Sequence, residues 1–154
     1  MGEEKNKINF DKKRISRYKD KFTYFEKIFK QVEKWTKSID SNKFVEDVSL
    51  ERQFAVFHAF QILMETITDL TTMQVKDLKM PPKDDYFNIE TLKEKKIISA
   101  ELALKIKEAN GLRNRIVHEY NGIDEKIAYK TILKLLKDIK TFKEVVRQWL
   151  KENL

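Results

Sequence analysis

The sequence predicts an all-α protein that forms a single domain. Apolar residues recur at intervals of three and four over long stretches, and no stretch alternates apolar and polar residues as a strand does. Only three Gly and two Pro interrupt the chain. Its 154 residues fit one domain, for which roughly 100 to 200 residues are typical.

The first predicted helix runs from about Asp11 to Ser38. Its apolar residues lie on one stripe, because they recur every three or four positions. They are Ile15, Tyr18, Phe22, Phe25, Ile28, Phe29, Val32 and Trp35. A polar loop, Asp40-Ser41-Asn42-Lys43, is expected to follow.

The second predicted helix runs from about Ser49 to Met73. Its start is left open by a few residues, because Ser49 is followed three positions later by Arg52 rather than by the Glu of a capping box. Its phenylalanines surround His58, for which we therefore expect a packing role. The apolar residues of this helix are Phe54, Phe57, Phe60, Leu63, Ile67 and Leu70.

Three further helices are expected in the second half of the chain. Pro81-Pro82 separates them from the second helix, because proline cannot donate a backbone N–H and restricts the residue before it. A short helix from about Ile89 to Lys95 comes first. The next begins after the N-cap Ser99 and ends at Asn121-Gly122, and the last runs from the cap Asp124 to about Leu150.

These elements predict an antiparallel four-helix bundle with an additional short helix. Residues 1–10 are expected to form a flexible N-terminal segment, and residues 11–154 a single helical domain.

Composition excludes several classes of function. Without Cys there is no disulfide framework and no thiol catalysis. Two histidines sixty positions apart show no metal-ligand spacing, and there is no glycine-rich phosphate loop. We therefore expect no metal and no cofactor. No apolar run approaches the roughly 20 residues of a membrane span, and the first residues lack the apolar core of a signal peptide, so we expect a cytoplasmic protein with no membrane association.

The net charge of +7 is open to two interpretations. Lysine and arginine that neutralise phosphates favour binding to nucleic acid. Lysines interspersed with glutamates are equally typical of solvated helix faces. Candidate phosphate-binding clusters are Lys12-Lys13-Arg14 with Arg17, and Lys93 with Lys95 and Lys96.

The segment from Leu112 to Tyr120 contains the residues with the clearest chemical potential. A guanidinium can clamp phosphate oxygens, an imidazole can transfer protons near neutral pH, and an amide can orient either group. These are the side chains needed to hold and cleave an RNA phosphate. They are Arg113, Asn114, Arg115, His118 and Tyr120.

Helical geometry divides these residues between two faces. On a continuous helix Arg113 and Tyr120 share one face, and Asn114 and His118 share another. Arg113 and His118 are turned about 140° from each other, so one straight helix cannot aim both at a single phosphate. Either the helix unwinds near His118, or two copies meet and a cleft between subunits gathers the groups.

The pattern Arg113-Asn114-x-x-x-His118-x-Tyr120 resembles the signature of HepT-like toxins of the HEPN superfamily, the helical toxins paired with minimal nucleotidyltransferase antitoxins. The resemblance covers about residues 11 to 150 and includes the Pro-containing connection. The second helix, with His58 among its phenylalanines, is more aromatic than is usual in the family.

The resemblance implies a homodimeric, metal-independent endoribonuclease. His118 would act as general base toward a ribose 2′-OH, and Arg113 would stabilise the charged transition state. Asn114 would orient Arg113 or His118 or bind phosphate, and Arg115 would contact RNA. Tyr120 would be adenylylated by an MntA-like nucleotidyltransferase antitoxin, which blocks access of RNA. The alternative is a noncatalytic helical partner that binds RNA or nucleotide for a separately encoded nucleotidyltransferase.

Overall fold

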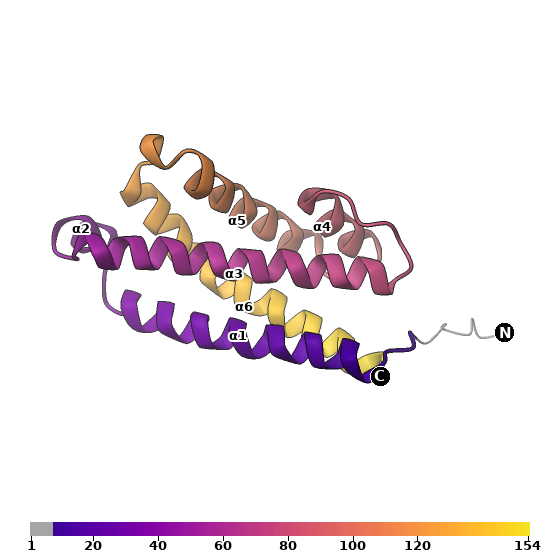
Figure 1. Ribbon diagram of the computed structural model, residues 1–154. Coiled ribbons are helices and arrows are strands. Elements are labelled where there is room, and N and C mark those ends of the chain that lie inside the picture. Colours follow the sequence, from indigo (N-terminus) through magenta and orange to yellow (C-terminus); the bar gives the residue numbers. More distant parts are fainter. Residues whose placement is uncertain (1–7) are drawn as a thin grey trace.

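The computed structural model describes residues 8–154 and, within them, contains helices and no strand (Figure 1). The all-α prediction is therefore confirmed for this part of the chain. The elements are α1 (Lys12–Thr36), α2 (Ser41–Glu46), α3 (Leu50–Asp77), α4 (Asp85–Glu94), α5 (Ala100–His118), the 3-10 turn η1 (Tyr120–Gly122) and α6 (Glu125–Glu152).

The long helices α1, α3, α5 and α6 lie side by side, and the chain reverses direction from each to the next (Figure 1). Helix α3 contacts α1, α4, α5 and α6. The short helix α2 lies at one end of the molecule, and α4 lies beside α5 toward the other end. Helix α3 is therefore the element on which α4, α5 and α6 all pack.

Aspartate and serine caps fix where the helices begin. Ser99 and Asp124 accept the backbone N–H three residues ahead, as predicted. Ser49 does the same for Arg52 and settles the helix start that the sequence left open. Asp40 does the same for Lys43 at 2.9 Å. A cap of this kind is worth about 1 kcal/mol. The loop predicted at Asp40-Ser41-Asn42-Lys43 is therefore wrong, because the Asp40 cap and the buried Phe44 make this segment the start of α2.

Two predicted boundaries also differ from the structure. The short helix expected from Ile89 begins at Asp85, because Asp84 caps it by accepting the N–H of Phe87 at 2.8 Å. Helix α3 continues past Met73 to Asp77.

One continuous apolar core lies between the long helices, with Phe25 and Phe29 stacked within it at a centroid distance of 5.6 Å. A smaller cluster under α2 joins Phe44, Val56 and Tyr129. Three residues of the predicted apolar stripes, Phe54, Leu104 and Ile127, are exposed instead. Apolar spacing identifies a helix, but it does not show how far its neighbours extend over it.

The described end of the N-terminal segment packs against the helices through Phe10. Residues 1–7 of the expected flexible segment, residues 1–10, lie outside the described residues. Phe10 packs edge-on against Tyr18 and Trp149, at centroid distances of 6.0 and 5.9 Å.

A polar cluster ties the start of α1 to the end of α3. Arg14 Nε donates to both carboxylate oxygens of Asp77 at 3.1 Å, and the Tyr18 hydroxyl donates to Asp77 Oδ2 at 2.6 Å. Burial, together with this hydrogen bond to a carboxylate, raises the pKa of Tyr18. Of the basic cluster predicted at the start of α1, Arg14 is thus occupied in holding the fold together.

Candidate functional site

Arg113 lies on the last part of α5, half-buried against α3. Its Nη2 atom donates to Glu65 Oε1 on α3 at 3.1 Å. Its Nη1 atom donates to Asn114 Oδ1 at 3.0 Å. The structure therefore brings two of the predicted site residues into direct contact and holds the guanidinium at the α3–α5 interface.

Glu65 is a site residue that the sequence did not reveal. Its Oε1 atom also accepts a hydrogen bond from Gln61 Nε2 at 2.9 Å. This bond and the neighbouring Arg113 guanidinium hold the pKa of Glu65 below its usual value, with a smaller contribution from His58. Glu65 is thus ionised at neutral pH, and it is a fixed negative group beside Arg113.

One sequence signal could have indicated this carboxylate. Gln61 and Glu65 are four residues apart, so they form a polar strip on a helix that is otherwise mostly apolar. His58 lies one turn earlier and is exposed. The packing role expected for His58 among the phenylalanines is therefore wrong, because the side chain lies at the surface, where it lines a groove with Ile28 and Trp35 of α1.

His118 is the last residue of α5 and is exposed. Within residues 8–154 no hydrogen bond or ion pair joins it to Arg113 or Asn114. Residues 113 to 118 are all helical, so the turn of about 140° between Arg113 and His118 is retained. A single copy of the chain therefore presents the cation and the imidazole in different directions. Arg115, between them, is exposed.

Tyr120 lies beyond the end of α5. The expected helix end at Asn121-Gly122 is wrong, because Glu119 leaves the helical conformation at φ −128° and ψ 26°. Tyr120 then begins η1, which the Gly122 N–H closes by donating to Glu119 O at 2.9 Å. Tyr120 consequently does not share a helical face with Arg113. Its side chain is 72% exposed, two residues from His118.

The part of the chain that the structure describes contains neither a cluster of metal ligands nor a helix that could span a membrane. No three His, Cys, Asp or Glu side chains there lie close enough together to hold a metal ion. None of the described helices combines the length and the apolar character needed to cross a bilayer.

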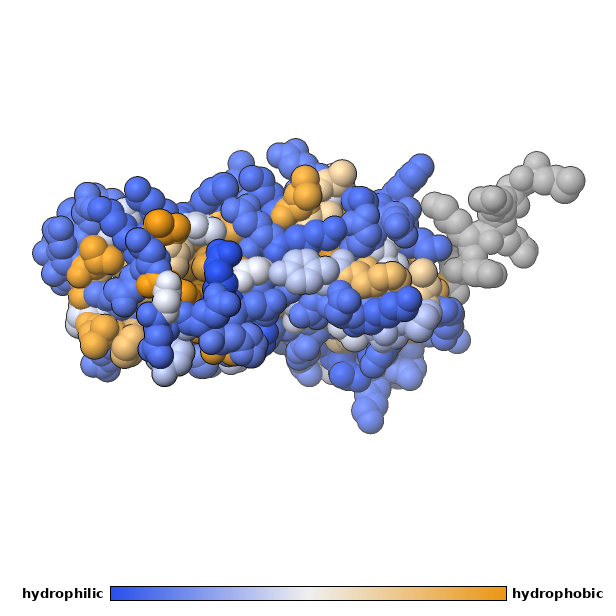
Figure 2. All heavy atoms as spheres, turned by 90° about the horizontal axis from the view of Figure 1, so that it is seen from above, coloured by the Kyte–Doolittle hydropathy of each residue, from blue (hydrophilic) through white to orange (hydrophobic). Residues whose placement is uncertain are grey.

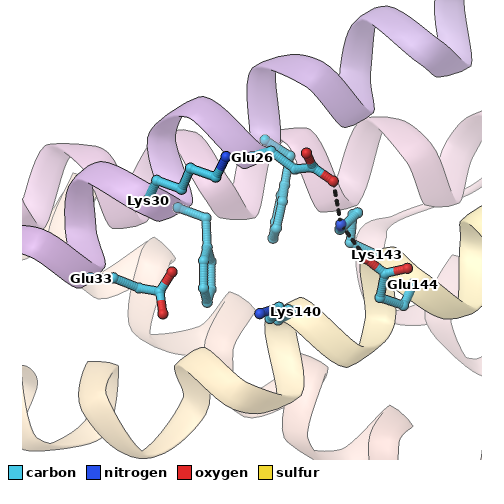
Figure 3. Close-up of a pocket in the computed structure, with 8 residues that line it drawn as sticks. Glu26, Lys30, Glu33, Lys140, Lys143 and Glu144 are labelled. Carbon is cyan, nitrogen blue, oxygen red and sulfur yellow. Dashed lines mark hydrogen bonds and ion pairs between the residues drawn. The ribbon is translucent and has the colours of Figure 1, made fainter.

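A surface pocket lies between α1 and α6 (Figure 3), and Arg113 is not among the residues that line it. Lys143 lies in its wall with only 3% of its side chain exposed. The ammonium donates to Glu26 Oε1 at 2.8 Å and to Glu144 Oε1 at 2.5 Å. Lys140, on the same helix, is exposed at the pocket rim. A buried cation held by two carboxylates makes this pocket a structural ion-pair site.

We expect the Lys143 site to make stability depend on pH. Hydrogen bonds from Lys143 hold the pKa values of Glu26 and Glu144 below their usual range. A lowered carboxyl pKa contributes stability that is present above the unfolded-state pKa and is lost as pH falls through the folded-state pKa. Lys143→Met should flatten this acid slope, because Glu26 and Glu144 lose the cation that lowers their pKa. It should also lower the free energy of unfolding at pH 7, because the substitution removes one partner of the ion pairs and leaves two carboxylates without it. Urea unfolding between pH 3 and pH 7 measures both.

Lys140→Met is the matched control, since it removes an exposed lysine from the same pocket and should leave the slope unchanged. A Lys143→Met protein with the wild-type acid slope would contradict the role given to this ion-pair site.

Comparison with known sequences shows a family match across most of the chain. The family model described as ribonuclease HepT-like matches residues 25–146. A predicted RNase of Archaeoglobus fulgidus is 39% identical over 97 residues, which cover 60% of this chain and 74% of that protein. The tRNA nuclease HepT of Aphanizomenon flos-aquae is 32% identical over 103 residues, which cover 61% of this chain and 69% of that protein.

Comparison with solved structures shows the same fold in a toxin. The tri-AMPylated HEPN toxin of Shewanella oneidensis, solved in complex with its MNT antitoxin, superposes with a TM-score of 0.75. The match covers 85% of this chain and 96% of the toxin, at 20% sequence identity. At that identity the likeness is one of fold.

Proposed function

Because the chain belongs to the HepT-like ribonuclease family, we propose that it is the toxin of a toxin–antitoxin pair and acts as a metal-independent endoribonuclease. The observation that carries the proposal is the arrangement at the end of α5, where Arg113 bonded to Asn114 lies within two helical turns of the exposed His118. Residues 11–154 act as one helical domain, an antiparallel four-helix bundle with short additional helices. The protein works in the cytoplasm, without a cofactor.

In the proposed reaction His118 removes the proton from a ribose 2′-OH. The 2′ oxygen attacks the adjacent phosphorus, the bond to the 5′ oxygen breaks, and that oxygen takes up a proton as it leaves. The products end in a 2′,3′-cyclic phosphate and a 5′-hydroxyl. Arg113 faces the charge that develops on the phosphoryl oxygens, where a well-placed cation contributes several kcal/mol. Asn114 orients Arg113, and Arg115 contacts the RNA backbone.

The protein is proposed to act as a homodimer. Arg113 points toward α3 and His118 toward solvent, so each copy supplies half of a site. A twofold axis places the end of α5 from one copy opposite the same region of the other. The Arg113 guanidinium has five N–H donors, and the two that bond Glu65 and Asn114 leave others free for a phosphate.

The proposed antitoxin is an MntA-like nucleotidyltransferase that transfers AMP from ATP to the Tyr120 hydroxyl. The high exposure of Tyr120 supports this assignment, because a modifying enzyme must reach the hydroxyl. The similar Shewanella toxin, which is AMPylated and bound to an MNT antitoxin, is the precedent.

The direct test is cleavage of RNA by the purified, unmodified protein in the presence of EDTA. Because the proposed site uses no metal, we expect the cleavage rate to be unchanged by the chelator. The 2′-OH nucleophile predicts 2′,3′-cyclic phosphate ends, visible by mass spectrometry, and a DNA strand of the same sequence should stay intact.

Cleavage of DNA, or activity that EDTA abolishes, would contradict this mechanism. If unmodified protein binds RNA but cleaves none, the noncatalytic partner of a nucleotidyltransferase becomes the better assignment.

A further inference from the structure

We propose that Tyr86, on α4, is an RNA-binding residue of this site, on which an unpaired base stacks beside the nucleotide being cleaved. The inference rests on the proposed ribonuclease function and deepens it, since it names a binding position outside the α5 motif. Three features support it: where Tyr86 touches α5, which residues of α5 follow from that point, and the chemistry around the ring.

Tyr86 rests on α5 at the one glycine in that helix. A Cβ atom added to Gly111 would lie 3.4 Å from the Tyr86 hydroxyl oxygen. Glycine weakens a helix interior, and here its lack of a side chain lets the hydroxyl approach the α5 backbone. Tyr86 is nevertheless 42% exposed, so only part of the side chain is used in this contact.

Gly111 and the proposed catalytic base lie on the same side of α5. Seven residues separate Gly111 from His118, and seven residues complete nearly two turns, over about 10.5 Å of helix axis. Asn114 and Arg115 lie between them. A strand laid along this side of α5 would therefore pass from Tyr86 over Asn114 and Arg115 to His118. One or two nucleotides can bridge that length.

The surroundings of Tyr86 suit a nucleobase. The neighbouring Phe87 is also exposed, and the Lys83 ammonium lies 4.3 Å from the centroid of its ring. The Asp84 carboxylate is occupied as the α4 cap. Exposed aromatic rings beside cations are how proteins hold unpaired bases and the adjoining phosphates.

Figure 2 looks onto the side of the molecule that α4 and α5 occupy, and shows pale and orange residues set among the blue, hydrophilic ones. The Tyr86 hydroxyl oxygen rests against Gly111, so the ring is the part of the side chain on which a base would stack.

The test is binding of a fluorescein-labelled, single-stranded 2′-O-methyl oligonucleotide of mixed sequence, followed by fluorescence anisotropy. This probe cannot be cleaved, because its 2′ oxygen is blocked. We expect Tyr86→Ala to raise the dissociation constant roughly 5- to 150-fold, the range found for loss of one base–aromatic stack. Tyr86→Phe keeps the ring and should stay near wild type.

Tyr24→Ala is the matched control. Tyr24 lies on α1 and is 45% exposed, so its removal takes away a similar aromatic surface far from α5. Thermal unfolding of each variant, followed by circular dichroism, shows whether the fold is intact. In cleavage assays Tyr86→Ala should raise KM more than it lowers kcat.

The outcomes separate this inference from the proposed function. If the protein lacks nuclease activity but its RNA binding depends on Tyr86, the proposed function is contradicted and the Tyr86 binding site is still supported. Cleavage in which folded Tyr86→Ala and Tyr24→Ala behave alike would overturn the Tyr86 assignment. A Tyr86→Ala defect confined to AMP transfer by the antitoxin would overturn it too, because the ring would then bind protein.

Discussion

His118→Ala is expected to lower the rate of RNA cleavage by about 10²- to 10⁴-fold, the usual contribution of a general base. Arg113→Ala should lower it by about 10²- to 10³-fold, as for removal of one group that stabilises transition-state charge. Both variants should fold, since His118 is exposed and Arg113 only half-buried. Single-turnover cleavage of a labelled RNA measures the rates. Arg52→Ala, which removes an exposed arginine of α3 outside the candidate phosphate-binding clusters, is the control for loss of charge.

Mixing the two inactive variants tests whether the site is shared. If Arg113 of one copy works with the partner's His118, a mixed dimer of Arg113→Ala and His118→Ala chains regains one of its two sites. Random pairing makes half of the dimers mixed, so roughly a quarter of the wild-type rate should return. No recovery in dimers shown to exchange subunits would place each site within one copy and require α5 to unwind near His118.

Adenylylation of Tyr120 is expected to lower RNA cleavage by at least roughly tenfold, because it adds a bulky anion that repels the RNA backbone. Incubation with the cognate nucleotidyltransferase and ATP should produce a mass gain of one AMP on the peptide that contains Tyr120. The position of Tyr120 in η1, two residues after His118, puts the new charge beside the proposed base.

Tyr120→Phe lacks the acceptor oxygen, so this variant should keep its cleavage activity and resist inactivation. Tyr24→Phe, at another exposed tyrosine, should still be inactivated. AMP found on a different residue, with activity lost, would remove Tyr120 from the regulatory role.

Local signals in the sequence predicted most of the fold. The caps Ser99 and Asp124 and the apolar spacing depend on neighbouring residues alone, and the structure confirms those helix starts. Asp40 carries the same kind of cap signal, yet the sequence predicts a loop there. The reason is that a helix as short as α2 shows almost no apolar periodicity. The exposure of Phe54 depends on where the other helices end. The apolar spacing within α3 carries no information about those positions.

The candidate site divides in the same way. Arg113, Asn114 and His118 could be proposed together from the sequence because they lie within two turns of one helix. The Gln61–Glu65 spacing could have indicated a polar strip on α3. The pairing of Glu65 with Arg113 could not be predicted, because the two residues are 48 positions apart and meet only once α3 packs on α5. The placement of Tyr120 was wrong because a helix end two residues earlier moves it off the helix altogether.

The Arg113–Glu65 pair makes phosphate binding at this position an exchange of anions. An unpaired surface arginine releases condensed counterions when it neutralises a phosphate. Arg113 already carries its countercharge in Glu65, 3.1 Å away, so an arriving phosphate must displace or share with a carboxylate that cannot diffuse off. Chloride and free carboxylates in solution compete poorly with the Glu65 carboxylate, because it is fixed beside the guanidinium. A phosphodiester held in place by the rest of a bound RNA strand has a high local concentration, so it can replace Glu65 as the partner of Arg113.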